Sequence, residues 1–212
     1  APEQIAFSHG VVFGEAGAQV KIKAAAPTGE ELTPLTAKAG NNGFPSYSPD
    51  GRQLVFRSRH GGSENHYIIA RAATNARSLT ESACTDTTCD WSPRVERIVF
   101  AANRDDNYEV WMIRPDGIGL HKIIGGGGRH NHPHFSPDAR WLVFTSQRAG
   151  YSAEEVSLPH QPQPYGDLFT VRADGTDLRR LTHNGFEEGT PAWSKVAQVT
   201  PSNEGGREGQ DY

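Results

Sequence analysis

The chain has 212 residues, which is enough for one sizeable hydrophobic core, and all-β folds of about 200–250 residues are commonly single domains. Its formal net charge of −4 at pH 7 argues against nucleic acid as a partner, because nucleic-acid-binding surfaces are usually basic. No stretch approaches the ~20 consecutive apolar residues needed to cross a membrane, so we expect no membrane span.

The first unit, residues 1–40, is a degenerate copy of a pattern that is clearer downstream. Phe7-Ser8 stands where Tyr47-Ser48 stands in the next unit, and residues 11–13 replace the later Leu-Val-Phe triplet. Residues 18–24 alternate between apolar and polar side chains, which predicts a strand.

The second unit, residues 41–84, is the most regular. Its Pro49-Asp50-Gly51 is typical of a turn, because Pro fixes φ while Asp and Gly supply side-chain hydrogen bonding and positive φ. The apolar runs that follow predict three strands, at residues 54–56, 66–70 and 77–80.

The third unit, residues 85–128, repeats the pattern at Trp91-Ser92-Pro93. It has Arg94-Val95 in place of the expected Asp-Gly, so either the turn is rebuilt there or the sequence is in error at this point. Alternating character predicts a strand over residues 108–114. We interpret the glycine run 125–128 as a flexible connector, because no helix follows that would make it a phosphate-binding loop.

The fourth unit, residues 129–186, is longer than the others because of a proline-rich insertion at residues 149–164. Long loops on the rim of a repeat array often carry function, which makes residues 150–166 a candidate contact surface. Residues 187–198 then begin a further copy, and we expect residues 199–212 to form a flexible tail.

The regular spacing of these units predicts the fold. An aromatic residue before Ser-Pro recurs every 44 residues, at Ser48, Ser92 and Ser136, and the apolar triplets keep that spacing at Phe56, Phe100 and Phe144. A period of this size is typical of a β-propeller blade of four strands. No segment sustains helical periodicity, so we predict an all-β propeller with four recognisable blades plus the first strand of another.

The repeat resembles that of the TolB-like (WD40-like) β-propellers. The likeness rests on FPSYSPDGRQLVFRSR, WSPRVERIVFAANR, HPHFSPDARWLVFTSQR and the blade ends PDGIGLHKI and ADGTDLRRLT. The phrases PHQPQPYGDLFT and RLTHNGFEEGTPAW are similar to a plant branch of that family, likened to the N-terminal propeller of dipeptidyl peptidases. Family propellers have six or seven blades. The resemblance therefore implies that the chain is the C-terminal part of a larger propeller, with a closed four-bladed ring as the alternative.

In such propellers the segment before Ser-Pro is the innermost strand, beside the central channel. The resemblance therefore implies a polar binding site at the channel mouth, formed by Asn42, Asp86, His130 and Glu188. The alternative is that these groups hold water and one another.

A second candidate site is rich in histidine. His130, His132 and His134 are spaced so that one face of a strand could present all three, and His160 and Gln161 could join them from the insertion. Imidazole suits several transition metals, so a divalent metal such as Mn, Zn or Ca is a candidate cofactor. The arrangement is similar to the His-rich metal site of oligogalacturonate lyases.

Cys84 and Cys89 are the only cysteines in the sequence. A small disulfide loop would indicate an oxidising compartment. The alternative is two small buried residues that never pair.

We therefore carry three functional hypotheses. The first is a non-enzymatic binding or scaffold module for a protein or carbohydrate partner, which the remaining blades of a longer chain or a second copy could accompany. The second is a metal-dependent enzyme acting on acidic sugars, and the third is a defence or lectin-like binding protein. The resemblance implies a secreted, extracellular or periplasmic location.

Overall fold

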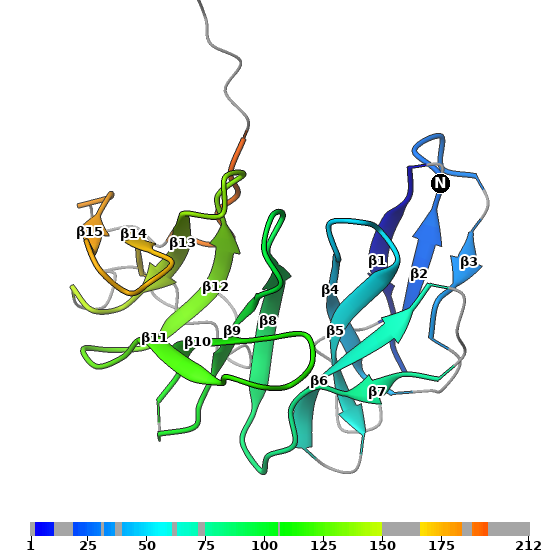
Figure 1. Ribbon diagram of the computed structural model, residues 1–212, viewed down its shortest axis with the longest axis horizontal. Coiled ribbons are helices and arrows are strands. Elements are labelled where there is room, and N and C mark those ends of the chain that lie inside the picture. Colours follow the sequence, from blue (N-terminus) through cyan, green and yellow to red (C-terminus); the bar gives the residue numbers. More distant parts are fainter. Residues whose placement is uncertain are drawn as a thin grey trace, which may run out of the picture.

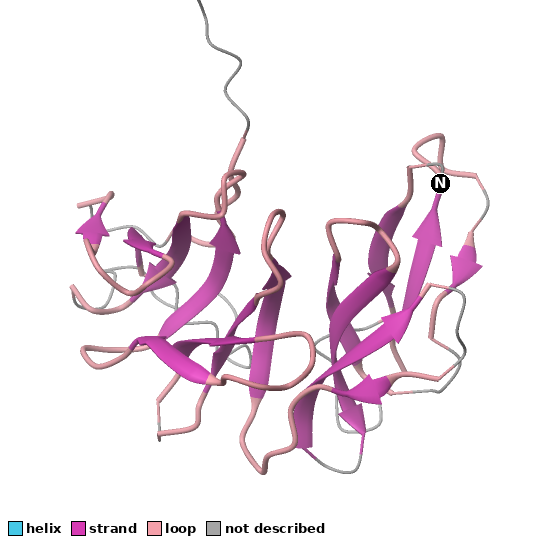
Figure 2. Cartoon of the chain, viewed as in Figure 1, coloured by secondary structure: helices cyan, strands magenta, loops and turns pink. Residues whose placement is uncertain are grey.

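The computed structural model describes residues 3–10, 19–30, 32–36, 40–60, 63–71, 75–105, 107–149, 166–183 and 188–194. Within these ranges the fold contains strands and no helix (Figure 2), as the sequence predicts. No helix in this part of the chain is long and apolar enough to span a membrane. Residues 150–165 of the proposed rim loop and the tail at residues 199–212 lie outside the described residues.

Four antiparallel sheets stand side by side in an open arc, and we number them as blades 1 to 4 (Figure 1). Blade 1 contains β1 (Ile5–His9), β2 (Lys21–Ala25) and β3 (Thr33–Pro34). Blade 2 contains β4 (Asn42–Tyr47), β5 (Gln53–His60), β6 (Ser63–Ala70) and β7 (Arg77–Ser78). Blade 3 contains β8 (Asp86–Trp91), β9 (Ile98–Ala102), β10 (Glu109–Ile113) and β11 (His121–Ile124). Blade 4 contains β12 (His130–Phe135), β13 (Trp141–Ser146), β14 (Asp167–Arg172) and β15 (Arg179–Arg180).

Each complete blade is a meander in which consecutive strands pair, and β4, β8 and β12 are the innermost strands. These inner strands contact one another from blade to blade. Apolar side chains fill the space between the blades, with Phe56, Phe100 and Phe144 among the largest fully buried ones. Burial of each such ring contributes about 1.5–3 kcal/mol, so the stacking of neighbouring blades stabilises the array.

The interpretation of Phe7-Ser8 as an inner-strand motif is wrong. In blade 1 Ser8 pairs with Ile22, and in blade 2 Arg57 pairs with His66. The backbone N–H groups of Ile22 and His66 both donate to a threonine at the end of their blade, so these two positions correspond. Phe7 therefore matches the Phe56 of the apolar triplet, and blade 1 begins with its second strand. The residues 11–13 assigned to that triplet lie outside the described ranges.

Every inner strand contains a bulge. The pairing register with the next strand shifts between Gly43 and Ser46 in β4, and at the equivalent places in β8 and β12. Phe44 and His132 have positive φ angles of 54° and 52° at this bulge. A bulge re-aims the side chains beyond it, so the simple alternation expected for a strand does not hold along the channel wall.

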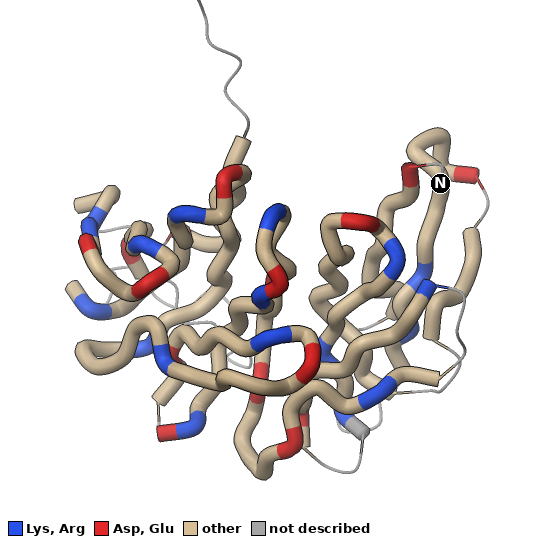
Figure 3. Tube along the Cα trace, viewed as in Figure 1, with Lys and Arg blue, Asp and Glu red and all other residues tan. Residues whose placement is uncertain are grey.

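Charged residues of both signs are interspersed over the blades (Figure 3). Many pair locally, as Arg114 does with Asp116 at 2.7 Å and Arg179 with Asp177 at 2.8 Å. Exposed pairs of this kind add little to stability.

Candidate ligand site on the inner strands

The four residues assigned to the channel mouth lie at the junctions between blades. Asn42, Asp86 and His130 are at most 1% exposed, and Glu188 is half-buried. The backbone N–H of Asn42 donates to Val20 O, and that of Glu188 donates to Gly166 O at 3.0 Å. Each residue thus ties the start of one inner strand to the blade before it.

At three of these junctions, the side chain of the junction residue forms a hydrogen bond with a threonine six positions earlier in the sequence. We call this residue the closing threonine. Thr80 Oγ1 donates to Asp86 Oδ2, and Thr182 Oγ1 donates to Glu188 Oε2 at 2.8 Å. Asn42 Nδ2 donates to Thr36 Oγ1 at the longer distance of 3.5 Å. These polar groups hold one another, so the geometry does not match an open channel-mouth site.

The junction at His130 is built differently from the other three, because Ile124 stands in place of the closing threonine. His130 Nε2 lies 3.0 Å from Gly126 O, and its Nδ1 lies 2.8 Å from Ser146 Oγ. Arg148 donates to the carbonyls of Gly125 and Gly126. These bonds anchor the glycine run that we interpreted as a flexible connector.

The three histidines of the second candidate site do not converge. His130 uses both ring nitrogens within the junction, His132 sits at the bulge with positive φ, and the His134 ring turns toward Asp90, with Nδ1 3.7 Å from Oδ2. The described residues contain no group of three or more potential metal ligands. His160 and Gln161 lie outside the described residues. The expectation of a shared face failed because the bulge breaks the two-residue alternation.

Cys84 and Cys89 are free thiols, so the disulfide alternative does not hold in this structure. Cys89 is buried on β8 and its Sγ lies 3.2 Å from Phe44 O of blade 2. The side chain of Cys89 is therefore directed toward the neighbouring blade.

A different set of equivalent positions brings polar groups together near the ends of the inner strands. These are the residues two positions before Ser-Pro or its equivalent, namely Ser46, Asp90, His134 and Ala192. Ser46 Oγ donates to Asp90 Oδ1 at 3.0 Å, and the backbone N–H of Phe135 donates to Asp90 Oδ2 at 2.9 Å. Asp90 thus bridges three successive inner strands and is held in a fixed orientation.

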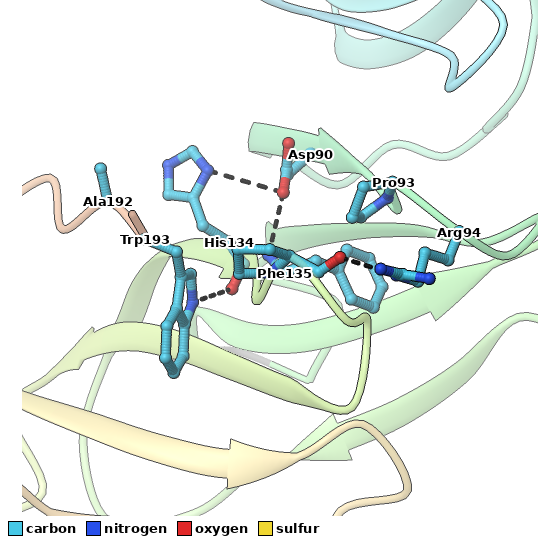
Figure 4. A pocket seen from close by; sticks show the side chains of 8 residues that line it. Asp90, Pro93, Arg94, His134, Phe135, Ala192 and Trp193 are labelled. Atoms are coloured by element: carbon cyan, nitrogen blue, oxygen red, sulfur yellow. Dashed lines mark hydrogen bonds and ion pairs between the residues drawn. The ribbon is translucent and has the colours of Figure 1, made fainter. Parts of the chain in front are cut away.

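A pocket of ≈ 550 Å³ opens beside Asp90. Figure 4 shows the His134 ring turned toward the Asp90 carboxylate, with Trp193 on one side and Arg94 on the other. Trp193 Nε1 donates to His134 O at 3.1 Å, and Arg94 Nε donates to Pro137 O at 2.9 Å. The other lining residues are Pro93, Phe135, Pro137 and Ala192.

The pocket combines charged, aromatic and apolar groups. It presents a fixed carboxylate, a guanidinium, an imidazole and the face of an indole that is 38% exposed. Its volume lies within the range of about 300–1,000 Å³ typical of ligand pockets. Sequence reasoning missed Asp90, Arg94 and Trp193 as site residues. The signal was present, because Ser46, Asp90 and His134 keep the 44-residue spacing.

No family model matches the sequence. The chain is 30% identical over 123 residues to an uncharacterized protein from Agrobacterium fabrum, covering 53% of this chain and 42% of the relative. It is 28% identical over 130 residues to a TolB homologue from Chlorobium luteolum, covering 61% of this chain and 29% of the relative. The chain thus spans less than half the length of these curated relatives.

Among solved structures, a TolB-like protein from Agrobacterium tumefaciens superimposes with a TM-score of 0.74 at 23% identity, covering 90% of this chain and 66% of that one. An oligogalacturonate lyase in complex with manganese gives a TM-score of 0.54 at 14% identity, covering 78% of this chain and 50% of that one. At these identities the likeness concerns the fold. The narrower resemblance to a plant branch stays a prediction.

Proposed function

The chain has the fold of TolB-like β-propellers, and from this premise we propose that it is a non-enzymatic binding module whose pocket beside Asp90 receives a group from a protein or carbohydrate partner. A propeller fold by itself hosts many functions, so the proposal depends on the pocket. The fold is consistent with a binding or scaffold role.

The observation that carries the proposal is the fixed carboxylate of Asp90. Its two oxygens accept hydrogen bonds from Ser46 and from the backbone of Phe135, which lie on different blades. Each oxygen keeps a second lone pair for a ligand donor. A donor on the ligand would therefore meet an acceptor that needs no reorganisation, which is the condition for affinity from a few polar contacts.

The remaining lining residues support a partner that is polar with an apolar face. Trp193 offers an indole surface, Pro93 and Pro137 offer apolar rings, and Arg94 offers donors. A sugar ring has hydroxyl donors together with an apolar face. A protein side chain that combines hydroxyl or amine donors with an apolar face would also match the pocket. A carbohydrate ligand would also serve a lectin-like role. We further propose a periplasmic or extracellular location, as the TolB resemblance implies.

The test is an NMR titration that follows the indole N–H resonance of Trp193 in the full chain. The probes are a set of neutral and acidic oligosaccharides and a set of short peptides. We expect at least one probe to shift this resonance, and Asp90→Asn to weaken that binding by about tenfold or more, since hydrogen bonds to a charged group contribute ~1.5–3 kcal/mol. Glu30→Gln, which alters an exposed carboxylate in blade 1, is the matched control and should bind normally.

Two results would overturn the proposal. One is that no probe shifts the Trp193 resonance while the protein is folded. The other is that Asp90→Asn binds the active probe as tightly as the Glu30→Gln control, which would place the contact elsewhere.

The metal-dependent enzyme acting on acidic sugars stays the alternative, because the lyase with manganese shares the fold. Its decisive measurement is metal content after dialysis against Mn or Zn. Stoichiometric metal that is lost in His132→Ala would favour the enzyme. Absence of bound metal from the full chain would remove this alternative.

A further inference from the structure

Two residues that line the pocket, Asp90 and Arg94, carry opposite charges and depart from the repeat. At the position of Asp90 the other units have a serine, a histidine and an alanine, namely Ser46, His134 and Ala192. At the position of Arg94 blades 2 and 4 have an aspartate, namely Asp50 and Asp138. Among blades 2 to 4, blade 3 alone thus combines an acid at the first position with a base at the second.

Arg94 does not have the role that its counterparts have in their turns. In blade 2, Asp50 Oδ1 accepts from Ser48 Oγ at 2.6 Å and so holds the turn. In blade 3, Ser92 Oγ instead accepts from the backbone N–H of Arg94 at 3.4 Å. The side chain of Arg94 therefore extends to blade 4, where Nε donates to Pro137 O at 2.9 Å.

This bond orients the guanidinium of Arg94 and leaves its two Nη groups for another partner. Among the described residues, no carboxylate forms an ion pair with Arg94. The acid next to Pro137, Asp138, accepts from Ser136 Oγ at 2.6 Å and from the backbone of Arg140 at 3.1 Å, so it serves its own turn. Parallel N–H donors of a guanidinium match the two oxygens of a carboxylate.

Asp90 is also held in place, with the opposite charge. Its oxygens accept from Ser46 Oγ at 3.0 Å and from the backbone of Phe135 at 2.9 Å. His134 Nδ1 lies 3.7 Å from Oδ2, which is beyond hydrogen-bonding distance. The Asp90 side chain is 19% exposed, so its carboxylate still reaches solvent at the pocket.

A ligand that fills the pocket takes water away from both charges. Both residues line the pocket, and Figure 4 shows Asp90 between Trp193 and Arg94. Covering a charge without supplying an opposite charge is strongly unfavourable. A neutral ligand leaves both Asp90 and Arg94 without a counter-charge, and a ligand with a carboxylate alone leaves Asp90 without one.

We infer that the pocket is specific for a zwitterionic peptide group, with an ammonium bound by Asp90 and a carboxylate bound by Arg94. This inference rests on the proposed function and narrows it, because a neutral sugar has neither charge and an acidic sugar has only the carboxylate. The apolar part of the peptide packs on Trp193 and on the rings of Pro93 and Pro137. Asp90 and Arg94 are the residues that determine specificity.

The test follows the indole N–H resonance of Trp193 in the full wild-type chain, so it does not depend on a variant that folds. The probes are the dipeptide Ala-Phe in four forms: free, N-acetylated, C-terminally amidated and blocked at both ends. We expect the free form to bind, and each single block to weaken binding by about tenfold or more, because each block removes one charge from a hydrogen-bonded pair.

Two further sets of probes define the ligand class. Free phenylalanine and the tripeptide Ala-Ala-Phe change the separation between ammonium and carboxylate, and the best binder of the three lengths is then compared with its own blocked forms. Glucose and glucuronate represent neutral and acidic sugars. We expect both sugars to bind more weakly than the best free peptide.

Two variants assign each charge to its residue. Asp90→Asn should bind the free and N-acetylated peptides equally while still distinguishing the acid from the amide. Arg94→Gln should bind the acid and the amide equally while still distinguishing the free from the N-acetylated peptide. Glu30→Gln and Arg52→Gln change exposed side chains in blades 1 and 2, and as matched controls they should keep both preferences.

The outcomes separate this inference from the proposed function. If a blocked peptide or a sugar binds as tightly as the best free peptide, the pocket is a ligand site but the inference is overturned. The inference is also overturned if Asp90→Asn and Arg94→Gln keep the preferences of the wild type. If no probe, sugars included, shifts the Trp193 resonance of the folded protein, the proposed function itself fails.

Discussion

His130 stands where the corresponding junctions have Asn42, Asp86 and Glu188, and this difference places an imidazole, rather than an amide or a carboxylate, in a buried junction. Burial lowers the pKa of His130 to about 4, from an unperturbed value near 6.5. The neutral ring fits its site, because Nε2–H donates to Gly126 O while Nδ1 accepts from Ser146. Protonation would remove that acceptor.

The sign of the pH effect follows from this shift. Between pH 6.5 and pH 4 the unfolded chain binds a proton at this residue and the folded chain does not. The stabilisation is therefore complete above pH 6.5 and is lost as the pH falls to about 4, by up to about 3 kcal/mol. Urea unfolding at pH 7 and pH 4.5 should show a smaller pH dependence in His130→Asn, which installs the residue that blade 2 has at this position, Asn42. An identical loss in both proteins would contradict the prediction.

Residue types also show where sequence reasoning succeeded and where it could not. A rebuilt turn was one of two alternatives that Arg94 in place of Asp left open, and the structure shows the backbone N–H groups of Arg94 and Val95 donating to Ser92 Oγ at 3.4 and 3.2 Å. In blade 2 the equivalent hydroxyl, Ser48 Oγ, instead donates to Asp50 Oδ1 at 2.6 Å. The junction role of Asp86 was not predictable from its own residue type, because its partner Thr80 lies at the end of the preceding blade.

At the scale of strands, local sequence patterns predicted which segments form strands better than they predicted which side chains share a face. The strands expected at residues 54–56, 66–70 and 108–114 correspond to β5, β6 and β10. The inner strands defeated the alternation rule, because each carries a bulge that changes which side chains share a face. For this reason the sequence placed His130, His132 and His134 together, whereas the structure joins His134 to Asp90.

The closing threonine predicts how strongly each inner strand is tied to the preceding blade. Thr80 Oγ1 accepts from the backbone of His66 at 2.9 Å and donates to Asp86, and all three residues are buried. Thr80→Val keeps the shape but leaves the buried backbone N–H of His66 unpaired and removes one of the hydrogen bonds that Asp86 accepts, so we expect a loss of about 1–3 kcal/mol in the free energy of unfolding.

Thr182→Val is the matched control for this prediction. Thr182 makes the same bonds with Leu168 and Glu188, but it is only half-buried, so water can replace the lost partners. The loss should be smaller than in Thr80→Val when both are measured by urea unfolding at pH 7. Equal losses would show that the bond to Asp86 contributes nothing beyond that of an exposed junction.

At the scale of the whole molecule, the repeat predicted the propeller but not which part of a blade comes first. The 44-residue period and the meander follow directly from the spacing of the Ser-Pro motifs. Which side chains reach the pocket depends on their exact position along the inner strand, and the repeat spacing alone does not give this position. The polar positions at Asp86 and His130 are buried in junctions, while the position four residues later, at Asp90 and His134, reaches the pocket.

The order of strands in blade 1 leads to a prediction about assembly. In the described part of the chain β1 pairs with β2 alone, whereas the equivalent β5, β9 and β13 each pair on both edges. Residues 188–194 begin a further blade, with Glu188 bound to Gly166 and Trp193 to His134. An unpaired edge offers its backbone to another strand, so the remaining blades of a longer chain, or residues 188–194 of a second copy, could cover β1.

Hydrogen exchange read together with sedimentation would distinguish these arrangements. In a monomer of this chain we expect the β1 amides to exchange faster than those of β9, because only one edge of β1 is hydrogen-bonded. If a second copy covers the edge, the β1 protection should rise with protein concentration together with the sedimenting mass. Protection of β1 equal to that of β9 in a concentration-independent monomer would contradict an open edge and indicate that the same chain closes it.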